Sequence, residues 1–153
     1  MPWVYTILQL RLHPSLIGLR ERILNGPKEK CYEVDLRYIT SRGHWYQSSW
    51  KGDLSKAGGI ATNIGIHFFD MLIWIFGSVK NIKVDQLQSD HASGSLELER
   101  ANVKWFLSIN DEHLPNDMKA AGKRTYRSLK LAGEEIEFSE GFTDLHTKSY
   151  AEI

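Results

Sequence analysis

The order of the patterned segments limits the fold more than any other feature of the sequence: helical periods come early and strand periods come late. Strand-like patterns cover residues 82–88, 93–99, 103–109, 125–131 and 135–138. Turn-forming residues at 99–102 and 132–134 predict hairpins, so these strands are expected to be antiparallel. Strands at 4–12 and 31–40 and helices at 14–25 and 60–76 precede them. The predicted class is therefore α+β, an open, mainly antiparallel β-sheet with helices packed on one face.

The helix expected at 14–25 has recognisable ends. Pro14 fits its first turn, His13 fits its cap, and Asn25-Gly26-Pro27 stops it. Gly77 is expected to end the helix at 60–76, in the position after its last turn.

The remaining segments complete one domain. Residues 111–123 form a polar loop, and a further helix is expected from residue 143. The second face of the sheet is expected to carry residues such as Trp105 and Leu107, and no element remains to cover it. We therefore predict a homo-oligomer that buries this open face. A length of 153 residues fits a single domain, 1–153.

Charge and motifs exclude several classes of function. The 19 basic and 19 acidic residues balance, which argues against nucleic-acid binding. No run reaches the roughly 18 apolar residues of a membrane span, and the N-terminus does not resemble a signal peptide. Cys31 is the only cysteine, so no intrachain disulfide forms and a cytoplasmic location is expected. Neither GxGxxG nor GxxxxGK[ST] occurs, so no Rossmann domain and no dinucleotide site are predicted within this chain.

A polar stripe interrupts the otherwise apolar segment GGIATNIGIHFFDMLIWIFG. Asn63, His67, Asp70 and Trp74 follow one another at helical spacing and share a face. His67 is the best general acid or base in the chain, because imidazole exchanges protons near neutral pH. The preceding pair, Gly58-Gly59, allows the close approach of another molecule and offers N–H groups to an anion.

Other interpretations of this stripe remain open. His67 could be a core histidine whose hydrogen bonds are satisfied within the protein. Asp70 could orient the His67 ring or cap a loop. A metal site built on His67 and Asp70, with His13 or His44, lacks a second spaced pair of ligands, so we predict no metal.

Residues 41–59 form a long segment in which aromatic and basic side chains alternate. A ligand with flat rings and several negative charges suits such a segment, because guanidinium groups pair with phosphate or carboxylate and aromatic rings stack. The same residues could instead pack on the core or carry solvated charges. The candidates for substrate binding are Arg42, Trp45, Tyr46, Trp50 and Lys51.

The segment GGIATNIGIHFFDMLIWIFG resembles the signature of the glucose–fructose oxidoreductase/inositol dehydrogenase (Gfo/Idh/MocA) superfamily, in which a Gly pair precedes a [D/N]xxxHxxD helix and a Trp-x-x-Gly end. Four further motifs are similar to those of UDP-N-acetylglucosaminuronic acid 3-dehydrogenases, which supply sugars for lipopolysaccharide O-antigens. These motifs are QLRLHP, YITSRGHWYQSSWKGD, VKWFLSI and EFSEGFTDLH.

The resemblance implies a C-terminal domain that binds substrate and forms oligomer contacts, whereas NAD is bound by a nucleotide domain absent from this chain. His67 then corresponds to the histidine that transfers the proton of the oxidised hydroxyl, and Asn63 to a residue that holds the substrate. Many members have Asp at the place of Asn63, whose amide cannot act as a base. The catalytic lysine of the family lies in the nucleotide domain.

The function expected on these grounds is an NAD-dependent oxidoreductase that oxidises the C3 hydroxyl of a UDP-sugar, with this chain inactive by itself. The competing hypothesis is a non-catalytic sugar-binding or oligomerisation module. The sequence gives no role to His146.

Overall fold

The computed structural model describes residues 7–49, 51, 55 and 58–151. Its centre is one six-stranded sheet with the order β2-β3-β4-β1-β5-β6. β1 runs parallel to β4, and the other neighbouring pairs are antiparallel. The open, mainly antiparallel sheet predicted from the sequence is confirmed. The strands are β1 (Tyr32–Thr40), β2 (Val79–Leu87), β3 (His91–Leu98), β4 (Ala101–Ser108), β5 (Thr125–Leu131) and β6 (Glu134–Glu137).

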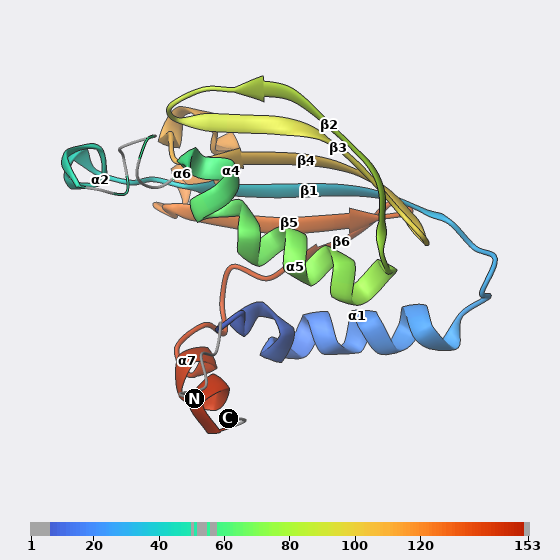
Figure 1. The fold of residues 1–153 in the computed structure, drawn as a ribbon. Coiled ribbons are helices and arrows are strands. Elements are labelled where there is room, and N and C mark those ends of the chain that lie inside the picture. The colour runs from blue at the N-terminus through green and yellow to red at the C-terminus, as the bar shows by residue number, and fades with distance from the viewer. Residues whose placement is uncertain (1–6, 50, 52–54, 56–57, 152–153) are drawn as a thin grey trace, which may run out of the picture.

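Helices cover one face of this sheet. Figure 1 shows α4 and α5 in front of the strands, with α1 alongside α5 and α7 beside the short η1 turn. The helical segments are η1 (Gln9–Leu12), α1 (Pro14–Asn25), α2 (His44–Ser48), α4 (Gly59–Asn63), α5 (Gly65–Phe76), η3 (Asp111–His113), α6 (Asn116–Ala120) and α7 (Leu145–Ala151). Within the described ranges, none of these helices has the length and apolar character that crossing a bilayer requires.

Helix α1 forms where capping and apolar spacing agree. The ring Nδ1 of His13 accepts a hydrogen bond from the Ser15 backbone N–H at 3.3 Å, so the predicted capping by His13 is confirmed. Leu16, Leu19 and Ile23 recur at helical spacing and are buried.

The helix predicted at 60–76 is divided into α4 and α5 by a turn at Ile64. The chain comes close to the sheet here, since a Cβ added to Gly65 would lie 3.1 Å from Leu107 Cδ1. Gly77 ends α5 as predicted, with φ 92° and its N–H donating to the Ile73 carbonyl at 2.9 Å. This arrangement holds α5 firmly against the central strands.

The strand predicted at 4–12 is wrong where the structure describes it. Gln9–Leu12 is the 3-10 turn η1, and residues 1–6 lie outside the described part of the chain. A short apolar run does not by itself distinguish a strand from a helical segment. Both neighbours of the central strand β1 are already other strands, and η1 instead buries Leu10 against the helical layer.

The expected apolar character of the open face is also wrong. Trp105 is 2% exposed and Leu107 is 0% exposed, because both point toward the helices, where the Trp105 ring lies 5.3 Å from that of Phe69. The alternate row on β4 is polar, and Asn102 donates a hydrogen bond to Glu33 of β1 at 2.8 Å. A small apolar cluster covers one end of this face. It consists of Ile39, Phe106, Leu114, Met118 and Tyr126.

Candidate functional site

A cavity of about 380 Å³ brings together segments that are distant in the sequence. It lies between η1, the end of β1, the junction of α4 with α5, β5 and the segment before α7. Five residues predicted from the sequence line it: Arg42, Tyr46, Lys51, Asn63 and His67. The other lining residues are Ile7, Gln9, Leu10, Tyr38, Ile64, Phe68, Arg127, Phe142 and His146.

Three other predicted binding residues do not line this cavity. Trp45 is 56% exposed, and its ring lies 5.8 Å from that of Tyr46. Gly58 caps α4 and Gly59 begins it, with φ values of 67° and 77°, a backbone conformation that glycine adopts without strain. Trp50 lies outside the described residues. A binding role for these four residues stays a prediction.

His67 lies on the face of α5 that borders the cavity. Its side chain is partly buried, and its Nδ1 is buried without a hydrogen-bond partner among the described residues. Burial lowers the pKa of His67, the charge of Asp70 raises it, and that of His146 lowers it. The net lowering favours a neutral imidazole near pH 7, which is the form that accepts a proton.

Asp70 and Trp74, the C-terminal half of the predicted polar stripe, have other partners. Both oxygens of the Asp70 carboxylate accept hydrogen bonds from Arg11, and the Nε–Oδ2 distance is 2.8 Å. The Arg20 guanidinium lies 4.7 Å from the Trp74 ring centre. The stripe therefore divides, with Asn63 and His67 facing the cavity and the other two residues holding neighbouring segments.

Asn63 and Tyr46 join the aromatic segment to the helix. The Asn63 amide donates to the Tyr46 hydroxyl at 3.1 Å, and the Tyr46 side chain is buried. The Arg42 guanidinium lies 5.9 Å from the Tyr46 ring centre. These contacts join the aromatic segment and the helix in the lining of the cavity.

Arg127 is a cavity residue that the sequence reasoning missed. It belongs to β5, opposite Tyr38 of β1 in the register. Its guanidinium lies 4.0 Å from the Phe142 ring centre and 5.5 Å from that of Tyr38. The strand period could have revealed it, because Arg127, Leu129 and Leu131 occupy the same, core-facing row. His146, in contrast, comes from α7, and no sequence signal pointed to it.

The cavity is positively charged. Arg42, Lys51 and Arg127 line it together with two histidines, and none of the described lining residues is Asp or Glu. An anionic ligand is the chemical complement of such a lining. Among the described residues, no three His, Cys, Asp or Glu side chains are grouped as metal ligands.

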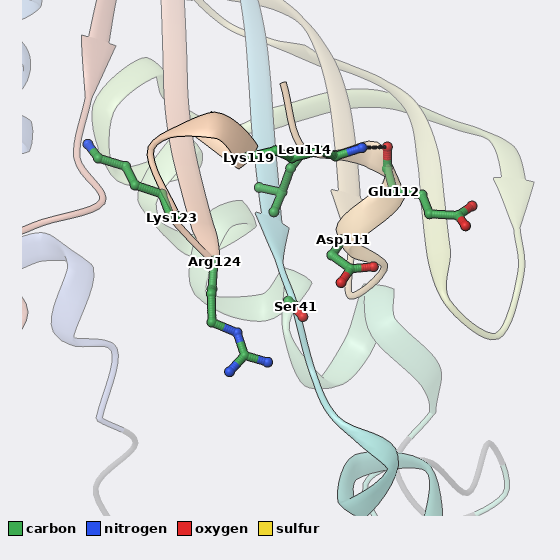
Figure 2. Close-up of a pocket in the computed structure, with 8 residues that line it drawn as sticks. Ser41, Asp111, Glu112, Leu114, Lys119, Lys123 and Arg124 are labelled. Atoms are coloured by element: carbon green, nitrogen blue, oxygen red, sulfur yellow. Dashed lines mark hydrogen bonds between the residues drawn. The ribbon is translucent and has the colours of Figure 1, made fainter. Parts of the chain in front are cut away.

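A second cavity, of about 360 Å³, has a mixed lining. Figure 2 shows Lys119 donating to the Glu112 carbonyl, whereas the side chains of Lys123 and Arg124 do not converge on one point. Asp111 and Glu112 offset two of the three positive charges, and none of the predicted site residues lies here. The first cavity is therefore the candidate functional site.

Comparison with known proteins places this chain in a family. The model of the family described as "Oxidoreductase family, C-terminal alpha/beta domain" (GFO_IDH_MocA_C) matches residues 20–106. The WlbA (WbpB) dehydrogenase of Thermus thermophilus, crystallised with NAD and α-ketoglutarate, is 53% identical with a TM-score of 0.92. The structure of the same dehydrogenase with NAD and UDP-GlcNAcA matches at 52% sequence identity, with a TM-score of 0.91.

These matches cover 97% of this chain but only 48% and 47% of the Thermus chains, so the chain spans about half the length of these relatives. The WlbA dehydrogenase of Bordetella pertussis, crystallised with NADH and UDP-GlcNAcA, shares the fold at 17% identity, with a TM-score of 0.67 over 97% of this chain and 48% of that one. The resemblance inferred from the sequence motifs is confirmed. The chain belongs to the Gfo/Idh/MocA oxidoreductase family, as its C-terminal α/β domain.

Proposed function

We propose that this chain is the substrate-binding part of an NAD-dependent dehydrogenase that oxidises the C3 hydroxyl of UDP-GlcNAcA or a close analogue, in the formation of lipopolysaccharide sugars. The observation that carries this proposal is the cavity, which places a neutral His67 among cations without any carboxylate in its described lining. A uronic acid attached to a diphosphate is a strongly anionic ligand and fits such a lining. The Thermus dehydrogenase crystallised with NAD and UDP-GlcNAcA, at 52% identity, supports the same substrate class.

The residues of this chain supply the proton half of the reaction. Oxidation of a secondary alcohol to a ketone removes the hydroxyl proton and a hydride from the same carbon. His67 accepts the proton, directly or together with the family's lysine, and Asn63 holds the sugar through its amide. NAD⁺, when bound, supplies the hydride acceptor. Gly58 caps and Gly59 begins a helix of only five residues, and neither lines the cavity, so we assign NAD to another domain.

Titration calorimetry with UDP-GlcNAcA tests this function. The wild-type chain and the variant His67→Asn should bind with nearly equal affinity, because the imidazole acts on the proton and not as an anchor. In a polypeptide that includes the nucleotide domain, His67→Asn should lower turnover by about 10²–10⁴-fold, as removal of a general base does. Absence of binding would contradict the proposal, and so would reduction of NAD⁺ by this chain alone.

We also propose that the chain forms a homo-oligomer through the open sheet face and that it acts in the cytoplasm. The location rests on the lone cysteine, Cys31, which cannot form an intrachain disulfide. Apolar burial does not support this oligomer, because charged side chains of both signs cover most of the open sheet face. Asp35, Arg37 and Lys104 are examples. Such a face can complement a second copy of itself.

A further inference from the structure

Arg127 occupies a position where a charged side chain is costly. It belongs to the set of alternate β5 residues that face the helices, next to Leu129, and it lines the cavity. Burial lowers its pKa, and the Tyr38 hydroxyl partly offsets this effect. Burial of an unpaired charge is unfavourable, so we expect this guanidinium to have a role in binding or packing that offsets the cost.

The protein satisfies this guanidinium only in part. Its Nη1 donates to the Ser139 carbonyl at 3.1 Å, and its Cζ lies 4.0 Å from the Phe142 ring centre and 5.5 Å from that of Tyr38. No carboxylate among the described residues forms an ion pair with it. A guanidinium carries five N–H donors in a planar fork. The bond to Ser139 and the interaction with the Tyr38 hydroxyl leave donors for a ligand in the cavity that Arg127 lines.

A second cation adds to the unbalanced charge. Arg42 lies near enough to contribute to the lowered pKa of Arg127. Two arginines that repel one another across a cavity without an acidic residue in its described lining are stabilised by a bound anion.

The segment that carries the Phe142 ring is held in place, so the arginine is preorganised. The ring Nε2 of His13 lies 2.7 Å from the Glu140 carbonyl oxygen, and the His13 ring lies 5.5 Å from that of Phe142. Gly141 has φ 85°, and a Cβ there would come within 3.1 Å of His13 Nε2. A fixed guanidinium loses little entropy when it binds its ligand.

We propose that Arg127 binds the carboxylate of the sugar and so selects a uronic acid over the uncharged sugar. This inference rests on the proposed function and names the residue that reads the substrate's acid group. A carboxylate matches the planar fork in a two-point geometry. Arg127 is partly buried on the core side of the cavity, whereas Arg42 and Lys51 are exposed and suit the diphosphate.

Two ligands that differ only at this group test the proposal. UDP-GlcNAcA carries a carboxylate where UDP-GlcNAc carries a hydroxymethyl group, and calorimetry gives the affinity of the chain for each. Wild type should prefer UDP-GlcNAcA by about 10- to 100-fold, the range of a charge-assisted pair. Arg127→Gln should abolish this preference while changing the affinity for UDP-GlcNAc less than about threefold, and Arg127→Lys should retain part of it because the charge remains without the fork.

Arg124→Gln is the matched control, because the same change is made in the other cavity. It should leave the preference intact, and thermal unfolding should show that every variant is folded. Equal weakening of both ligands by Arg127→Gln would overturn the inference, and so would an unchanged preference. If wild type binds both ligands equally well, the inference fails while the proposed function stands. If wild type binds neither ligand, both fail.

Discussion

His67 lies where its environment keeps the imidazole uncharged. Burial is the main cause of its lowered pKa, and Asp70 opposes that effect although Arg11 holds the Asp70 carboxylate. A folded pKa below the unfolded value of about 6.5 means that protonation favours the unfolded chain. The stability due to His67 is therefore complete above about pH 6.5 and is lost as the pH falls through the lower, folded pKa.

NMR titration of the His67 ring should accordingly give a midpoint below 6.5, the ordinary histidine value. Asp70→Asn should lower this midpoint further, because it removes a charge that favours the imidazolium. Asp85→Asn is the control, since that carboxylate pairs with Lys83 on β2. A midpoint at or above 6.5 in wild type, or an upward shift in Asp70→Asn, would contradict this account of the site.

At the scale of elements, close packing limits where side chains can be added. Gly94 of β3 has no room for a Cβ, which would lie 2.1 Å from the Lys83 carbonyl oxygen and 2.6 Å from Trp105 Cζ2. Gly18 in α1 has nothing within 4 Å of that position. Substitution by alanine is therefore expected to change the free energy of unfolding in opposite directions at these two glycines.

Urea unfolding should show this difference. Gly94→Ala is expected to destabilise the fold by about 2 kcal/mol or more, since both contacts must shift. Gly18→Ala is expected to stabilise it by about 0.5–1 kcal/mol, because alanine is the better helix former. Equal changes in the free energy of unfolding would contradict the close contact between β3 and the edge strand β2 at Gly94.

The elements that the sequence predicted well are those with a local cause. The cap and apolar period of α1 lie within its own residues, and the same holds for the alternation in β1. The parallel pairing of β1 with β4 depends on strands far apart and has no local signal. The prediction placed Trp105 and Leu107 on the wrong face of the sheet. The sequence of a strand shows which residues share a face, but not which of the two faces the helices cover. In the site, the helix motif identified His67 and Asn63, whereas Arg127 and His146 are brought in by tertiary packing.

At the scale of the whole molecule, the polar open face makes association sensitive to charge. Lys104 is exposed on β4 near the middle of this face, and charge reversal there would place like charges opposite one another in a twofold contact. Sedimentation velocity should give an oligomer for wild type and smaller species for Lys104→Glu. Lys148→Glu on α7 makes the same charge change on the helical side of the sheet and should leave the oligomer intact. Monomeric wild type, or dissociation by Lys148→Glu alone, would exclude the open face as the interface.

The central position of β1 has a consequence for how the chain reaches its native state. The hydrogen bond from Asn102 to Glu33 spans 69 residues, and that between Thr40 and Thr125 spans 85. The β2-β3-β4 meander can form from neighbouring segments, but β1 must wait until both of its flanking strands have left the ribosome. Because closing such long loops is slow, the rate-limiting event in folding is expected to be the insertion of this early-synthesised strand between two late ones.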